Sequence, residues 1–245
     1  MEDIPWLPKP TNELIARTVS ALEAALGSNL CSAVLVGNAM NPARADRARG
    51  PEILAIVVPP LALTKLAERL HDPMTEGARV RVLTEDELVR SADVFALELA
   101  EWKARHRLLA GRDVLKDLTP TRAHLRHGIE TELRGLTRRM RNRVLTGLAT
   151  DSRRDDPFDG VVAGYDRLLV SAYHTLALLG DEPPQNEHGI VRAIATETGA
   201  EAAPFLEKLD ALRHGGRFQP VAALEVLLTF AEPLIELVDS MELPA

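Results

Sequence analysis

The stretch that decides the fold of the first half is Leu30–Val58, LCSAVLVGNAMNPARADRARGPEILAIVV. Its early part, Ser32–Val36, is a run of small and β-branched residues that Gly37 ends. A polar loop follows, and Ile53–Val58 is then a continuous apolar run bounded by turn residues. Such a run is typical of a strand buried on both faces. The stretch therefore predicts a strand, a glycine turn, a loop and a second strand.

Short elements surround this stretch as far as Gly111. Alternation of arginine and apolar residues in Arg79–Leu83 predicts a half-buried strand, and Val94–Leu99 is a further strand candidate. Thr84 with Glu87 three residues later forms a capping box, which predicts a short helix over 85–91. Another short helix is expected over Glu101–His106. The first half therefore predicts a small domain with a mixed sheet and helices.

The second half predicts helices alone. Apolar residues at helical spacing indicate a long helix over 121–148, and a second long helix is expected over Phe158–Leu179. Further helices are expected at about 189–198, 201–212 and 219–241. The fold class is therefore α+β, with an α/β domain over residues 1–117 and an all-α helical bundle over residues 118–245.

Composition limits the classes of function. The chain has 245 residues and a formal net charge of −7, which argues against a general nucleic-acid coat protein, and we expect no DNA partner. Residues 1–150 carry 22 basic and 19 acidic side chains, whereas residues 151–245 carry 7 and 17. The lone cysteine, Cys31, allows no intrachain disulfide. We find no signal peptide and no membrane span, and therefore expect a soluble cytoplasmic protein.

The first half resembles a known family. A strand ending in Gly-Ser, a loop, and a next strand with two carboxylates at alternate positions mark the polymerase-β-like nucleotidyltransferase superfamily. Val36-Gly37, the strand that starts at Glu52, and the segment Leu108–Gly111 resemble that arrangement. The helical second half is similar to the helical domains that follow minimal or kanamycin-type nucleotidyltransferase domains. The resemblance implies nucleotidyl transfer with two metal ions, which three carboxylates hold.

The resemblance can be carried over residue by residue. Glu52 matches the first carboxylate of the family, Glu98 matches the third, and Leu54 stands where the second would be. Leucine cannot bind a metal ion, so Glu52 and Glu98 are the only candidate catalytic or metal-binding residues. Asn38 replaces the serine of the Gly-Ser pair. The candidate nucleotide-binding residues are Gly37, Asn38 and Arg49.

These replacements lead to two hypotheses. The first is a protein of nucleotidyltransferase fold that has lost catalysis and binds a nucleotide or a protein partner, as a homo-oligomer formed through its helices. The alternative is an active enzyme that transfers a nucleotide to an unknown acceptor with Mg²⁺ held by Glu52, Glu98 and an unrecognised ligand. Structural alternatives remain for both glutamates: Glu52 as a solvated strand-entry residue, and Glu98 as the ion-pair partner of Arg105 or Arg107.

The long helix over 121–148 is rich in arginine, and Arg134, Arg138 and Arg141 share one face. One interpretation of this face is a basic surface that binds the phosphates of a nucleotide or RNA. The other is a solvated face whose arginines pair with the acidic second half, and we favour this second interpretation. Two windows, Arg122–His127 and Arg167–His174, match an arginine–histidine pattern of helical ribonucleases. A chain with this many arginines produces such matches by chance, and packing explains Tyr173-His174 inside an apolar helix.

Overall fold

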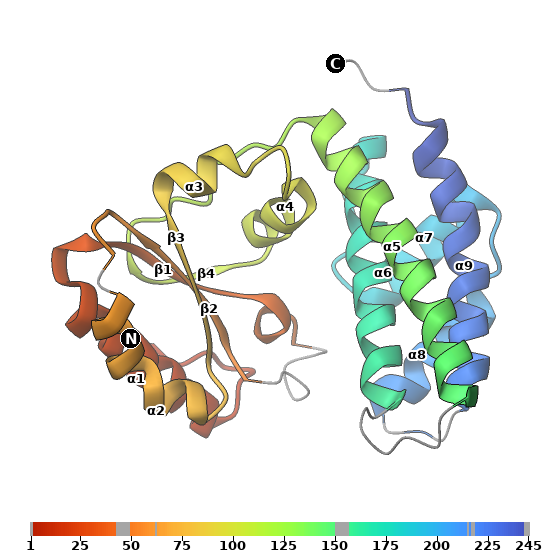
Figure 1. Cartoon of the computed structure of the whole chain (residues 1–245). Helices are drawn as coiled ribbons and strands as arrows, with labels where there is room; N and C mark the ends of the chain where they lie inside the picture. Colours follow the sequence, from red (N-terminus) through yellow and green to blue (C-terminus); the bar gives the residue numbers. More distant parts are fainter. Residues whose placement is uncertain are drawn as a thin grey trace. The chain divides into compact units, whose positions relative to one another are not determined.

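The computed structural model describes residues 2–42, 50–61, 63–149, 157–214, 216 and 219–242. The chain divides into two compact units, Met1–Pro120 and Thr121–Ala245, which we call unit 1 and unit 2 (Figure 1). Unit 1 contains a mixed sheet and helices, and the described part of unit 2 is helical. The predicted α+β class, with a small mixed-sheet domain before a helical region, is confirmed.

Unit 1 is built on four strands in the order β3-β2-β1-β4. β2 (Glu52–Val57) pairs antiparallel with β1 (Leu30–Val36) and parallel with β3 (Arg79–Thr84). The fourth strand, β4 (Arg107–Gly111), pairs antiparallel with β1. The two strands predicted from the opening stretch are therefore adjacent at the centre of the sheet, where both faces are covered.

Helices cover both faces of this sheet (Figure 1). One face packs against α1 (Lys9–Leu26) and α2 (Leu63–Thr75), and its buried residues include Ile53 and Ala55 of β2. The opposite face includes Leu54 and packs against α3 (Glu85–Arg90) and α4 (Ala96–Ala104). Because neighbouring residues of a strand point to opposite faces, a continuous apolar run is what a doubly covered strand requires.

The strand predicted at Val94–Leu99 is wrong. Val94 and Phe95 are exposed residues of a turn, and α4 begins at Ala96. Within α4 the buried residues are Ala96, Leu99 and Trp102, a spacing of three that places them on one helical face. The separate helix expected over Glu101–His106 is the end of α4. A short apolar run does not distinguish a strand from a buried helix segment, which explains the error.

Unit 2 consists, in its described part, of five helices. α5 (Arg122–Ala149) packs against α6 (Pro157–Leu179) and α9 (Pro220–Ser240), and the two shorter helices, α7 (Glu187–Thr198) and α8 (Ala202–His214), complete the set. Its core is mostly aliphatic, with an aromatic group at the centre. The ring of Phe205 lies 4.6 Å from the ring of Tyr165 and 4.5 Å from that of Phe230, measured between centroids.

The first arginines of α5 bind the ends of neighbouring helices. A guanidinium N–H of Arg122 donates to the backbone oxygen of Leu178, near the end of α6. Arg126 donates to the backbone oxygens of Val238 and Asp239, near the end of α9, at 2.9 and 3.0 Å. Both arginines therefore donate to carbonyl groups near the end of a neighbouring helix, where few backbone donors remain. These two side chains have a structural role.

Candidate functional site

Glu52, the first residue of β2, is almost buried although it carries a carboxylate. Its side chain is 10% exposed. The carboxylate lies beside Gly37, the residue that follows β1, whose φ is +73°. A Cβ atom at position 37 would stand 3.2 Å from Oε2 of Glu52. The glycine is therefore required both by its backbone conformation and by the closeness of the carboxylate.

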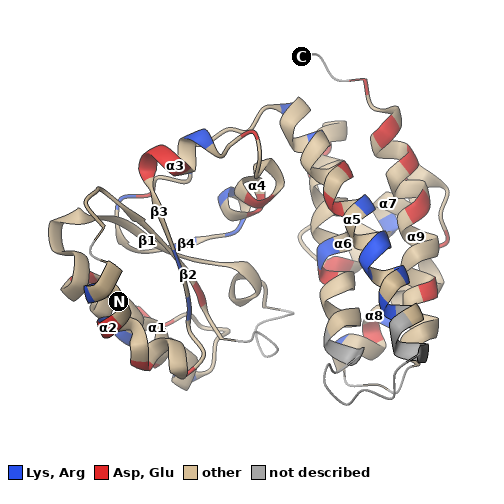
Figure 2. Ribbon diagram, viewed as in Figure 1, with Lys and Arg blue, Asp and Glu red and all other residues tan. Residues whose placement is uncertain are grey.

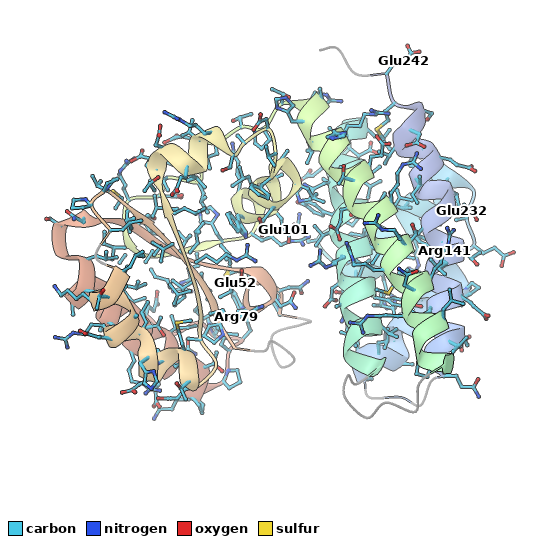
Figure 3. All side chains as sticks on the ribbon, viewed as in Figure 1. Glu52, Arg79, Glu101, Arg141, Glu232 and Glu242 are labelled. Carbon is cyan, nitrogen blue, oxygen red and sulfur yellow. The ribbon has the colours of Figure 1, made fainter. Side chains whose placement is uncertain are left out.

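Two arginines of the next strand hold this carboxylate. In the parallel pairing of β2 with β3, Glu52 is level with Arg79, and Leu54 is level with Arg81. Nη2 of Arg79 lies 3.0 Å from Oε2 of Glu52, and both side chains are labelled in Figure 3. Nε of Arg81 lies 2.7 Å from Oε1 of Glu52. Both arginines point to one face of the sheet because they are two residues apart on a strand.

Arg81 also binds the second candidate carboxylate. Its Nη1 lies 2.6 Å from Oε1 of Glu98, in the first turn of α4. One helical turn further along α4, the ring of Trp102 lies beneath the guanidinium, with Cζ of Arg81 5.6 Å from the ring centroid. We call Glu52, Arg79, Arg81 and Glu98 the arginine–glutamate cluster. It joins β2, β3 and α4 on one face of the sheet.

The structure brings Glu52 and Glu98 together, but through a guanidinium. Glu52 is a buried partner of two arginines rather than a solvated strand-entry residue. Glu98 pairs with Arg81 rather than with the arginines that the sequence suggested, since Arg105 pairs with Glu101 and Arg107 with Glu2. The two positive and two negative groups of the cluster cancel in formal charge. A cation bound by both glutamates would have to displace Arg81.

The other predicted site residues lie in different surroundings. Leu54 is fully buried in the core between the sheet and α4. Asn38 belongs to a short 3-10 helix, η2 (Gly37–Met40), where its backbone oxygen accepts from the backbone N–H of Asn41 at 3.1 Å. The indole N–H of Trp6 donates to the backbone oxygen of Ala39 at 3.0 Å and fixes this turn. Arg49 lies outside the described residues.

Sequence reasoning missed Arg79 and Arg81 as members of the site. The signal was present in the alternation Arg79-Val80-Arg81-Val82, which places both arginines on one face of a strand. Their partner could not be identified from the sequence, because the parallel register of β3 against β2 depends on the whole fold. No feature of the sequence marked Trp102 as a neighbour of the site.

The arginine–histidine windows hold residues that act in packing. Arg122 binds the end of α6, and Arg167 pairs with Glu132 at 2.8 Å. His174 is 4% exposed, and its ring contacts that of Tyr173 edge to face, at 5.1 Å between centroids. Arg122 and His174 therefore contribute to the helix packing of unit 2, whereas His127 is exposed and the side chain of Arg167 is 58% exposed.

A histidine–aspartate pair lies just after the end of α4. Nε2 of His106 is 3.1 Å from Oδ1 of Asp113, and its Nδ1 is 3.2 Å from the backbone oxygen of Lys103. The same carboxylate oxygen accepts from the backbone N–H groups of Leu115 and Lys116. Both ring nitrogens of His106 therefore face acceptor oxygens.

We expect Asp113→Asn to remove an acid-sensitive part of the stability of unit 1. Burial acts to raise the pKa of Asp113, but the hydrogen bond and charge of His106 and the backbone N–H groups lower it below its usual value. A lowered folded-state pKa contributes stability that is present above the unfolded-state pKa of about 3.9 and is lost as the pH falls through the folded-state pKa. The difference in unfolding free energy between wild type and variant should therefore shrink below about pH 4.

Urea unfolding of both proteins between about pH 3 and pH 6 measures this difference, which we expect to be about 1 kcal/mol at the upper end. Asparagine retains an acceptor oxygen for the two backbone N–H groups, so the comparison isolates the charge. A difference that stays constant down to the lowest pH would contradict the assigned role of the His106–Asp113 pair.

No protein-family model matches the chain, and its sequence matches no curated protein. In the described parts of the chain, no group of three or more histidine, cysteine, aspartate or glutamate side chains is placed to hold a metal ion. None of the helices described there combines the length and apolar character needed to cross a membrane.

Proposed function

We propose that this chain is a nucleotidyltransferase-like protein that has lost catalysis and serves as a binding protein for a nucleotide or a protein partner. The bridge of Arg81 between Glu52 and Glu98 carries the proposal. In the family that the sequence resembles, carboxylates in these places hold metal ions for phosphoryl transfer. Here the guanidinium takes the place of a cation, and the nearby Leu54 is part of the core.

The geometry of the cluster supports a binding role without metal. The side chains of Arg79 and Arg81 remain 51% and 48% exposed, so part of each guanidinium faces solvent. Exposed guanidinium N–H groups suit phosphate or carboxylate ligands. Glu52 and Glu98 neutralise the charge of the two arginines, however, so tight binding of a free polyanion to the arginine–glutamate cluster is unfavourable. A nucleotide or an acidic segment of a partner would bind weakly and without a divalent cation.

The active enzyme remains the competing function, because Glu52 and Glu98 do converge on one group. If the guanidinium of Arg81 moved into solvent, the carboxylates of Glu52 and Glu98 would both border the position that it left. They would still be two ligands, and a hard divalent cation bound by two protein carboxylates is held weakly. Metal-dependent chemistry would therefore require a third ligand from the substrate or from elsewhere in the chain.

We expect no metal-dependent nucleotidyl transfer. The test incubates the full chain with ATP and Mg²⁺ or Mn²⁺ and measures pyrophosphate release, while calorimetric titration of ATP with and without Mg²⁺ measures binding. The expected result is no pyrophosphate above the buffer control and no increase of affinity with the cation. Loss of any weak ATP binding in Arg79→Met would locate it at the cluster.

The informative variant is Glu52→Gln, and its control is Glu68→Gln on the exposed side of α2. Pyrophosphate release by the wild-type chain that Glu52→Gln abolishes and Glu68→Gln leaves intact would establish an active enzyme. The proposal of lost catalysis would then be wrong.

A further inference from the structure

The outer surfaces of α5 and α9 carry stripes of opposite charge. On α5 the stripe consists of exposed residues spaced four, three and four apart: Arg134, Arg138, Arg141 and Leu145. On α9 it consists of exposed or half-exposed residues at the same kind of spacing: Val221, Glu225, Leu228, Glu232, Glu236 and Asp239. At 3.6 residues per turn each set lies on one side of its helix. We call these the basic stripe and the acidic stripe (Figure 2).

The two helices that carry the stripes are antiparallel neighbours. Arg126 near the start of α5 binds the backbone near the end of α9. Further along α5, Met140 lies beside the earlier part of α9: a Cβ on Gly164 would stand 3.1 Å both from its Sδ and from Cδ1 of Leu227. The helices therefore run in opposite directions (Figure 1).

The stripes match each other level by level. Nη2 of Arg134 lies 2.5 Å from Oδ2 of Asp239. Seven residues onward in α5 and seven residues back in α9 are two equal steps along the antiparallel axes, so the side chains of Arg141 and Glu232 reach a similar level along the bundle. The structure gives no ion pair between these two described residues. Figure 3 labels both side chains. Leu145, the last member of the basic stripe, is 67% exposed, an apolar residue that the bundle leaves uncovered.

Most arginines of α5 already have partners, but two of the basic stripe do not within the described residues. Arg134 pairs with Glu130 and Asp239, and Arg139 pairs with Glu132. For Arg138 and Arg141 the structure gives no ion pair with a described residue, and the same is true of Glu232 and Glu236. Adjacent helices of unit 2 therefore carry arginine and glutamate side chains for which the structure gives no ion pair with a described residue.

We propose that the outer face of α5 and α9 is the interface of a homodimer, formed by two copies of this chain. A two-fold axis parallel to the helices and midway between them places α5 of one copy opposite α9 of the other without changing the level of any residue. Arg141 of each copy then faces Glu232 of the partner subunit. Leu145 lies on the same face, so the pairing also covers this exposed apolar side chain.

Charge favours a second copy over a nucleic acid. Residues 121–245 carry 14 basic and 19 acidic side chains, and the acidic stripe runs directly beside the basic one. A phosphate backbone laid on α5 would be repelled by α9. A second copy brings opposite charges to both stripes, including Arg141 and Glu232. Because exposed ion pairs contribute little each and are screened by salt, the dimer is expected to weaken as ionic strength rises.

Sedimentation velocity of the full chain over a concentration series, at low and at high salt, tests the proposal. We expect a monomer–dimer equilibrium at low salt that shifts toward monomer at high salt. Arg141→Glu and Glu232→Arg should each weaken the dimer roughly tenfold, since the two-fold axis turns two attractions into two repulsions. Lys65→Glu and Glu68→Arg on α2 of unit 1 make the same charge changes outside the proposed face of α5 and α9 and should leave the dimer unchanged.

A mixture of the two single variants gives the sharpest result. The Arg141→Glu chain and the Glu232→Arg chain are complementary at both contacts, so a mixed dimer should form about as tightly as the wild type. The chain that carries both substitutions should also dimerise. A wild-type chain that stays monomeric at low salt, or single variants that dimerise normally, would overturn the proposal. Circular dichroism of each variant verifies that the helices are intact.

Discussion

Replacing Arg213 with methionine is expected to destabilise unit 2 by about 3–5 kcal/mol. Arg213, in the last turn of α8, joins three helices through two carboxylates. Its Nε and Nη2 lie 2.8 and 2.9 Å from the two carboxylate oxygens of Glu187 on α7. Nη2 also lies 2.5 Å from Oδ1 of Asp166 on α6. The side chains of Arg213, Glu187 and Asp166 are 7%, 8% and 13% exposed.

The expected loss arises from the carboxylates that would remain. Burial alone would lower the pKa of Arg213, but its bonds to Glu187 and the charge of Asp166 raise that pKa, so the guanidinium stays charged in any practical buffer. Methionine fills a similar space without charge. Two buried carboxylates would then face each other without a cation, and an uncompensated buried charge is far more costly than the ion pair is stabilising.

Urea unfolding followed by far-ultraviolet circular dichroism measures this change, because the helices of unit 2 dominate the signal. Both tryptophans of the chain, Trp6 and Trp102, lie in unit 1, so their fluorescence reports on the other unit separately. Arg192→Met on the exposed side of α7 is the matched control and should change stability little. A shift below about 1 kcal/mol in Arg213→Met would show that the buried triad is not essential to the helix packing.

The sequence predicted the parts of the fold that depend on local pattern. The central strands were recognisable because β2 is apolar on both faces, and the long helices because their apolar residues recur at helical spacing. The start of α3 was recognisable from Thr84 and Glu87, and the structure confirms both hydrogen bonds of the capping box. In each case the deciding residues lie within a few positions of one another.

The parts that could not be predicted depend on contacts between distant residues. Glu52 and Arg79 are far apart in the sequence, and only the parallel register of β2 and β3 makes them neighbours. The run around Phe95 fits both strand and helix patterns. The helix is the form that buries Trp102, whose ring lies under Arg81. In the same way Arg213 meets Glu187 and Asp166 only after three helices have packed.

The replacement of Leu54 by aspartate is expected to destabilise unit 1 by about 4 kcal/mol or more, and not to create a metal site. Leu54 has no exposed surface and packs with Val34, Ile56 and Trp102 between the sheet and α4. A carboxylate there loses the apolar contacts and is removed from water. Arg81 is level with this position on β3, but its guanidinium already binds Glu52 and Glu98.

Tryptophan fluorescence during urea unfolding measures the loss, since Trp102 contacts this region, and Leu54→Met is the control because it conserves volume and apolar character. Manganese binding to the aspartate variant, measured by calorimetry, decides the chemical question. If the variant folds with near wild-type stability and binds Mn²⁺ while the wild type does not, the core at Leu54 is compatible with a metal ligand. The packing around Leu54 and Arg81 would then no longer support the proposed loss of catalysis. If the variant unfolds as expected, the core does not tolerate a carboxylate at this position, which supports the proposal.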